Sequence, residues 1–475
     1  MSLIHPDFLL HNAVGRRLFH EVASKLPIVD YHNHLDPTML ADNRPFTDLT
    51  ELWIKPDPYK HRAMRIHGIP ERGITGEAAN REKFDHWAAT VPATWGNPLH
   101  HWSALELKRH FGIDTPLNPD TADEIWQEAT AQLGDERFRP LRILNDLGVT
   151  TVCTSDDLLS DVSRHRRATR QRMVDVYPSL RGDSIVNVSS SRFHDWMNEL
   201  SAATSLEITD LETYLAAVDR RLDDFAGVGC VLADHALNSG FHFTEPNEQR
   251  AAQSFLAILH GETPVEDWEH NLRDYLLVAL GRRYAARGWG LQLHVGAQRR
   301  TSARLRKLAG GAGGYASIGN PADITSIAAL LDTIERGGGL PDLVLYTLNP
   351  ADNAAFASLT GSFAEDGRPG KVQFGPAWWY NDQLSGIRDH LDTVASYGLL
   401  HHWIGMTTDS RSLLSFSRHE YFRRILCNLL GEWVQRERLP PDGPWLDAAV
   451  MNICYGNARR WLDTKTPTHA PYQME

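Results

Sequence analysis

The stretch PIVDYHNHL, residues 27–35, joins a short β-branched run to two histidines at its carboxyl end. Residues two apart in a strand face the same side, so we expect His32 and His34 to point in one direction. A lone HxH pair is a weak metal pattern. It gains meaning if this strand belongs to a barrel, because barrel enzymes gather their site residues at the carboxyl ends of the strands.

Seven more runs of this kind follow along the chain, and longer segments of helical character lie between them. Such alternation is typical of parallel strands joined by helices. The eight runs cover residues 27–32, 149–156, 174–181, 227–235, 289–296, 342–350, 371–378 and 401–410. The third contains Pro178 and competes with residues 184–189 for the strand. We therefore predict an α/β fold, a (β/α)8 TIM-type barrel.

The first two runs are roughly 115 residues apart, far more than one connecting helix needs. The intervening stretch is rich in Trp, His and helix formers, so we predict a large, mainly helical insertion after the first strand, forming a cap over one barrel end. The predicted divisions are 1–36 with the first strand, the insertion 37–147, the rest of the barrel 148–462 and a C-terminal tail 463–475. Residues 419–434 show helical periodicity and should form the last large helix.

Charge and composition argue against several classes of protein. The formal net charge is −12 and no Lys/Arg-rich run is present, which argues against nucleic acid as a partner. No apolar run is long enough to cross a bilayer and no signal peptide is apparent, which argues against a membrane location or secretion. The four cysteines lack paired spacing, so we expect a cytoplasmic protein. The glycine runs at 310–314 and 337–339 lack the Lys-Ser/Thr of a phosphate-binding loop and are interpreted as turns.

A barrel that closes in order places its last strand beside its first. That arrangement brings Asp409, in the sequence MTTDSR, next to His32 and His34. Two neutral imidazoles and one carboxylate suit a divalent ion such as Zn²⁺ and leave a coordination position open. We therefore predict one metal site at these three residues.

Long motifs spread along the chain resemble those of a known family. Among them are FLLHNAVGRRLFH (8–20), DYHNHL (30–35), NREKFDHWAATVPATWGNPLHHW (80–102), LHVGA (293–297), QFGPAWWYNDQ (373–383), GMTTDSRS (405–412) and RHEYFRRILC (418–427). Together they resemble the uronate (glucuronate) isomerase family of the amidohydrolase superfamily, over about residues 8–458. Two-metal hydrolases of that superfamily usually carry a bridging Lys or Glu and a second histidine where this chain has Asp234-His235 and Leu348-Asn349-Pro350. The resemblance therefore implies a single metal.

The family resemblance also implies a reaction, the aldose-ketose isomerisation of D-glucuronate to D-fructuronate and of D-galacturonate to D-tagaturonate. A proton moves between C2 and C1. The residues expected to be catalytic are Asp409, Arg411, Tyr59 and Arg181, and those expected to bind substrate are His294, Trp378, His32 and Asp234. The expected partners are a small hexuronate and further copies of the same chain in a homo-oligomer.

Individual roles follow from side-chain chemistry. Asp409 is expected to handle the carbon-bound proton, with Arg411 setting its basicity and orientation. Tyr59, its phenol acidified by a neighbouring arginine, is expected to carry the hydroxyl proton between O2 and O1. Neighbouring strand residues face opposite sides, so Trp378 is expected to point inward and Trp379 away.

Two other hypotheses stay open. A single-metal hydrolase of the amidohydrolase type, acting on a sugar acid derivative, would share the scaffold, because a fold does not fix a reaction. A sugar-acid-binding protein without turnover would be expected to have lost Asp409, Arg411 or Tyr59. All three are present.

Overall fold

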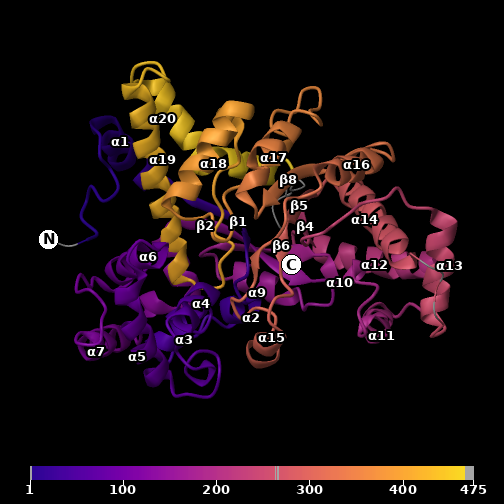
Figure 1. Cartoon of the computed structure of the whole chain (residues 1–475), viewed down its shortest axis with the longest axis horizontal. Helices are drawn as coiled ribbons and strands as arrows, with labels where there is room; N and C mark the ends of the chain where they lie inside the picture. The colour runs from indigo at the N-terminus through magenta and orange to yellow at the C-terminus, as the bar shows by residue number, and fades with distance from the viewer. Residues whose placement is uncertain (1–2, 263, 265–266, 466–475) are drawn as a thin grey trace.

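A parallel sheet of seven strands runs through the centre of the computed structural model, which describes residues 3–262, 264 and 267–465 (Figure 1). Its strands, in hydrogen-bonded order, are β1 (Ile28–Asn33), β2 (Val149–Asp157), β3 (Asp175–Arg181), β4 (Leu232–Leu237), β5 (Gly290–Val295), β8 (Asp342–Thr347) and β9 (Val372–Phe374). Neighbouring strands pair in parallel and the sheet forms a half-barrel. The α/β class is confirmed.

The third predicted run forms β3 although Pro178 stands in its middle. Pro178 lies opposite Thr154 of β2 in the parallel register. The register with β4 is confined to Leu180 and Arg181, beyond the proline, which has no N–H to donate. The competing stretch 184–189 is not a strand, since it begins inside α10 (Asp183–Val186).

The eighth predicted strand is wrong, because residues 401–410 have no strand assignment. Gly405, at φ +86°, and Asp409, at φ +50°, adopt left-handed backbone conformations that interrupt an extended chain. A Cβ on residue 405 would lie 2.1 Å from the carbonyl oxygen of Ile453, so only glycine fits there. The backbone therefore cannot continue the regular ladder of the sheet.

Other hydrogen bonds hold this segment beside β1. The carboxylate Oδ2 of Asp30 accepts the Thr408 N–H at 2.9 Å and lies 2.9 Å from Nε2 of His419. The Asp409 N–H donates to the His32 carbonyl at 3.1 Å. The segment at 401–410 thus lies beside β1, as a barrel that closes in strand order requires, although it does not form an eighth strand.

Helices occupy the stretch between β1 and β2. They are α2 (Pro37–Asp42), α3 (Leu49–Trp53), α4 (Pro58–Ile66), α5 (Asn80–Thr90), α6 (Pro98–Glu106), α7 (Ala122–Gln132) and α8 (Pro140–Asp146). Asp57 and Asn97 cap α4 and α6, and each is followed by a proline at the first helical position. In Figure 1, α3 to α7 gather at the lower left, to one side of the sheet.

The remaining helices flank the sheet or extend from it (Figure 1). They are α1 (Ala13–Arg17), α9 (Ser163–Thr169), α11 (Phe193–Thr204), α12 (Leu211–Ala226), α13 (Glu248–Leu259), α14 (Trp268–Ala286), α15 (Ala303–Ala309), α16 (Ile324–Glu335), α17 (Asn353–Leu359), α18 (Leu384–Tyr397), α19 (Arg418–Gln435), α20 (Pro444–Met451) and α21 (Asn457–Asp463). The last large helix predicted, residues 419–434, is confirmed as α19.

The structure contains two short strands that were not predicted from the sequence. The short strands β6 (Ala297–Gln298) and β7 (Ser317–Ile318) pair antiparallel on either side of α15 and were not predicted. Within the described ranges, no helix combines the length and apolar character needed to cross a membrane. Most of the predicted tail, residues 466–475, lies outside the described residues.

Replacing Asp30 with alanine is expected to lower the free energy of unfolding by about 2–5 kcal/mol, because His419 and the Thr408 N–H lose a buried partner. Urea unfolding followed by circular dichroism measures the change. The matched control is Asp389→Ala at an exposed position of α18, expected within about 0.5 kcal/mol of the parent. Equal stability of the two variants would refute the tethering role of Asp30.

Candidate active site

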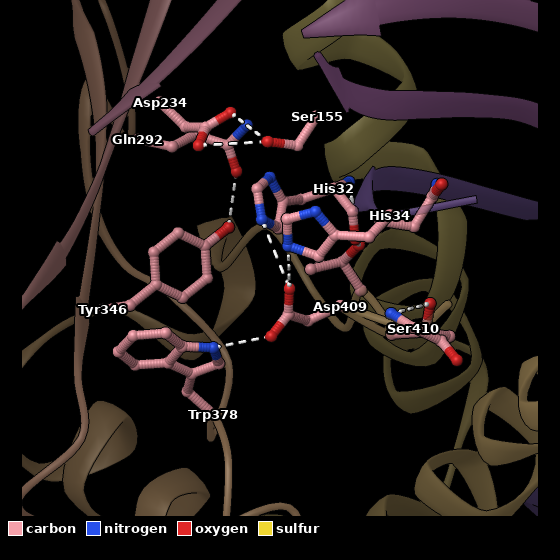
Figure 2. Close-up of polar contacts among 12 residues, drawn as sticks. His32, His34, Ser155, Asp234, Gln292, Tyr346, Trp378, Asp409 and Ser410 are labelled. Atoms are coloured by element: carbon pink, nitrogen blue, oxygen red, sulfur yellow. Dashed lines mark hydrogen bonds and ion pairs between the residues drawn. The ribbon is translucent and has the colours of Figure 1, made fainter. Parts of the chain in front are cut away.

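Three side chains predicted to converge do so at the carboxyl end of β1. Nε2 of His32 lies 3.4 Å and Nε2 of His34 lies 3.0 Å from Oδ1 of Asp409. Figure 2 shows both imidazoles facing this carboxylate. The register of β1 on β2 is irregular between Asp30 and Asn33, so the strand is distorted where it presents His32.

Both tryptophans after β9 bind the other oxygen of Asp409. The indole N–H groups of Trp378 and Trp379 donate to Oδ2 at 2.7 and 2.5 Å. The prediction that Trp379 points away is therefore wrong. The strand ends at Phe374 and Tyr380 has φ +63°, so strand alternation does not apply to these residues.

Burial and hydrogen bonding set the charges of this cluster. Burial by itself would raise the pKa of Asp409, but hydrogen bonds from His32 and His34 hold it well below its usual value. Burial lowers the pKa of His34 to about 4. Burial opposes the charged form of His32 too, but the carboxylates of Asp409 and Asp234 raise its pKa. The site therefore contains an ionised carboxylate beside a neutral His34, the form in which an imidazole binds a metal.

The donor set fits a divalent cation. His32, His34 and Asp409 place one ligand atom each within 4.8 Å of one another, and so do His32, Asp234 and His294. Nε2 of His294 is buried and has no hydrogen-bond partner among the described residues. The ring of His294 is stacked on Tyr346 at 4.4 Å between centroids, which fixes its orientation. Nitrogen and carboxylate donors of this kind are typical of a metal site with an open position.

These residues line a cavity of about 370 Å³, a size typical of small-molecule pockets. Every residue predicted for the site is on its wall: His32, His34, Tyr59, Arg181, Asp234, His294, Trp378, Asp409 and Arg411. The wall also carries three arginines that were not predicted, Arg62, Arg299 and Arg418, against the three carboxylates of Asp57, Asp234 and Asp409. Five guanidinium groups facing three carboxylates favour an anionic ligand.

The predicted arginines differ in how much of their charge is already paired. Nε of Arg181 lies 2.9 Å from Oδ2 of Asp183. Arg411 forms no ion pair with Asp409, or with any other carboxylate in the described ranges. The expected Asp409–Arg411 pair is therefore absent as a direct contact, because the imidazoles and indoles already occupy both carboxylate oxygens.

Asp234 lies within β4 and lines the cavity. Its carboxylate accepts a hydrogen bond from the hydroxyl of Ser155 at 3.0 Å (Figure 2) and another from that of Ser179 at 3.2 Å. Burial raises the pKa of Asp234 to about 6, although His32 and Arg181 lower it. The serine hydroxyls fix the position of this carboxylate close to His32.

Tyr59 comes from the first turn of α4, where its backbone N–H is held by Asp57 at 2.9 Å. Its hydroxyl donates to Oδ2 of Asp382 at 2.7 Å. The Arg418 guanidinium lies 5.7 Å from its ring centre. Burial and the Asp382 charge raise the pKa of Tyr59 well above its ordinary value, and Arg418 opposes this only in part. The expected acidified phenol is therefore not found.

Sequence reasoning missed Trp379, Asp382, Arg299 and Arg418. Asp382 and Arg418 stand inside the motifs QFGPAWWYNDQ and RHEYFRRILC, but neither spacing nor periodicity marks them as site residues. Arg299 follows β6, a strand that was not predicted, and its guanidinium lies 4.8 Å from the Trp379 ring centre. Only the folded chain brings Trp379, Arg299 and Arg418 to the same cavity and Asp382 to the Tyr59 hydroxyl.

Three comparisons with known proteins all find similarity to glucuronate or uronate isomerases. A family model described as glucuronate isomerase matches residues 1–462. A uronate isomerase of Serratia proteamaculans (strain 568) is 42% identical over 464 residues, 97% of this chain and 98% of that protein. The crystal structure of a uronate isomerase from Thermotoga maritima has a TM-score of 0.90 and 31% identity, covering 97% of this chain and 100% of that one. A glucuronate isomerase structure from Caulobacter crescentus, at 20% identity and TM-score 0.88 over 98% of both chains, shows a likeness of fold.

Replacing His34 with alanine is expected to weaken the binding of a divalent cation by at least about 100-fold, since loss of an outer-shell group alone costs 10–100-fold. Titration of chelator-treated protein with Zn²⁺ in a calorimeter measures the change. The matched control is His390→Ala, at a buried histidine of α18 whose ring packs on Phe374 of β9. This variant should bind Zn²⁺ with the affinity of the parent. Equal affinity of the His34 variant and the parent would exclude this metal site.

Proposed function

The chain belongs to the glucuronate isomerase family, and from this premise we propose that its site interconverts the aldehyde and keto forms of hexuronates. The chain is an isomerase, an intramolecular oxidoreductase that moves hydrogen within one molecule. The proposed substrates are D-glucuronate, giving D-fructuronate, and D-galacturonate, giving D-tagaturonate. One observation carries this proposal: an ionised Asp409 lies on the wall of a cavity that is lined by more arginines than carboxylates.

The substrate carboxylate is held by arginines that lack carboxylate partners. Arg411 and Arg299 both line the cavity, and in the described part of the chain neither is paired with an acid. Guanidinium groups bind carboxylates with two parallel hydrogen bonds, which fixes the sugar acid in one orientation. An oriented substrate places C2 and C1 at a constant distance from the base.

Asp409 is the group proposed to move the carbon-bound proton. Its carboxylate is ionised and faces the cavity, and the indole N–H groups of Trp378 and Trp379 hold its Oδ2. It takes the proton from C2 and returns it to C1, while the hydroxyl proton moves from O2 to O1. The rings of Tyr59, Trp378 and Trp379 line the cavity and limit the access of water to the proton between the two transfers.

His32, His34 and Asp409 are proposed to hold one divalent cation, with Zn²⁺ as the proposed ion. Once bound, such an ion supplies Lewis-acid polarisation of a substrate oxygen. His294 and Trp378 are proposed to contact the substrate, through an imidazole nitrogen and an indole face. Asp234 and Arg181 complete the polar lining of the cavity.

The finer architecture forms part of the same proposal. Residues 37–147 act as a cap that contributes Tyr59 to the cavity, residues 148–462 complete the barrel, and residues 401–410 take the place of its eighth strand. The protein is proposed to act in the cytoplasm as a homo-oligomer. The charge and composition of the chain support this location.

Incubation of the purified protein with D-glucuronate or D-galacturonate should yield the corresponding keto acid, followed by a ketose-specific colour reaction or by nuclear magnetic resonance. In deuterated water, exchange at Asp409 during the transfer should place deuterium at C1 of a fraction of the product. A hydrolase would leave both uronates unchanged, and that result would refute the proposed reaction.

Replacing Asp409 with asparagine should lower kcat by about 100-fold or more, because an amide cannot accept the C2 proton. Steady-state kinetics measure the loss, and circular dichroism verifies that the fold is retained. The matched control is Asp447→Asn, at an aspartate of α20 away from the cavity, which should keep parent kinetics. A nearly normal kcat in the Asp409 variant would exclude this residue as the base.

A further inference from the structure

Asp382 is a buried carboxylate directly behind Tyr59. It follows the Trp378–Trp379 pair and precedes α18, and it is only 7% exposed. Its Oδ2 accepts the Tyr59 hydroxyl at 2.7 Å and an Nη1–H of Arg418 at 2.7 Å. Its Oδ1 is buried and accepts no hydrogen bond from any other described residue. The proton of the Tyr59 hydroxyl is therefore directed at Oδ2 of this carboxylate.

The Tyr59 ring is fixed in this direction. Asp57 holds its backbone N–H, and the rings of Trp102 and Tyr380 contact it edge-on at 5.6 and 6.4 Å between centroids. A phenol has one proton to donate, and here it goes to Asp382. The phenol oxygen can therefore only accept a hydrogen bond from a hydroxyl in the cavity.

We propose that Asp382 holds the hydroxyl proton of the substrate during isomerisation, receiving it through Tyr59 and returning it by the same route. This inference rests on the proposed function, and it assigns the O2-to-O1 transfer to a tyrosine–aspartate relay rather than to a tyrosine acidified by arginine. Tyr59 is the group in contact with substrate, and Asp382 acts through it as a positioning residue.

The protons balance in this relay. As Asp409 removes the C2 proton, the substrate O2–H passes its proton to the Tyr59 oxygen, and Tyr59 passes its own proton to Asp382. The C2–H electron pair forms a C1–C2 double bond and shifts the C1 carbonyl pair onto O1, which gives an enediolate. The O2 electrons later form the C2 carbonyl, as the double-bond pair takes up the proton at C1. Asp382 next returns a proton through Tyr59 to O1 as Asp409 protonates C1. Both residues finish in their starting states.

The charges around Asp382 favour a carboxylate that accepts a proton and later releases it. The groups that face it are Tyr59 from α4, Arg418 from α19 and, further away, Asp409. Burial raises the pKa of Asp382 to about 6, although Arg418 lowers it. A carboxylate poised near neutrality can both accept and release a proton. Arg418 also donates to the Thr408 carbonyl at 2.7 Å, which anchors the relay to the segment that carries Asp409.

The test is Asp382→Asn, whose amide oxygen can still accept the Tyr59 hydrogen bond but cannot take its proton. Its kcat with D-glucuronate should fall about 100-fold or more, with KM within about 3-fold of the parent. Tyr59→Phe should show a comparable loss. Because both residues act in one relay, the double variant should be no slower than Tyr59→Phe alone.

A second variant distinguishes the loss of a proton acceptor from a defect in folding. Asp382→Ala leaves space for a small acid, and added formate should raise its kcat, an effect that a structural role would not produce. The matched control is Asp274→Asn at a fully buried aspartate of α14, hydrogen-bonded to Arg273 and to the Thr244 N–H, which should keep the parent kcat. Thermal unfolding of all variants reports their stability.

The outcomes separate this inference from the proposed function. A parent enzyme that isomerises uronates, combined with a nearly normal kcat in Asp382→Asn, would overturn the relay and leave the proposed function standing. Independent, multiplying losses in the double variant would overturn it too, and so would a folded Asp382→Ala that formate does not rescue. A parent enzyme with no isomerase activity would refute both proposals together.

Discussion

A single, mostly buried carboxylate, that of Asp409, places the strongest constraint on this structure. An ion removed from water must be matched by hydrogen bonds, or burial becomes very costly. Asp409 is matched by two imidazoles at Oδ1 and two indoles at Oδ2, drawn from the first strand and from the segment after β9. Its left-handed backbone, at φ +50°, is the kind of local strain that persists only where the surroundings enforce it.

A second buried carboxylate makes that geometry possible. Asp30 lies two residues before His32 in β1 and binds the Thr408 N–H and His419. It therefore replaces with side-chain hydrogen bonds the strand pairing that the segment at 403–410 does not form. The backbone can therefore adopt the left-handed conformation that turns Asp409 toward the histidines. The segment nevertheless stays in contact with β1.

The helices between β1 and β2 contribute to the same site through a buried ion cluster. Nζ of Lys60 lies 2.5 Å from Asp57 and 3.2 Å from Glu106, and the Ser415 hydroxyl donates to Glu106 at 3.3 Å. Because Asp57 also caps α4 and accepts the Tyr59 N–H, these contacts fix the phenol relative to the segment before α19. The cavity is thus built jointly by residues far apart in the chain.

The sequence by itself determined the α/β class, five of the eight strands with ends within three residues, β4 with a start predicted five residues too early, the last large helix, and the convergence of His32, His34 and Asp409. Each of these follows from local periodicity or from the closure of successive parallel strands, which a linear pattern records. The short β9 was placed correctly but only in part. Tertiary structure alone decided that residues 401–410 are not a strand, that Trp379 joins Trp378, and that Asp382 and Arg418 surround Tyr59. These outcomes depend on left-handed backbone turns and on pairing between buried charges distant in sequence, and neither leaves a periodic signal in the chain.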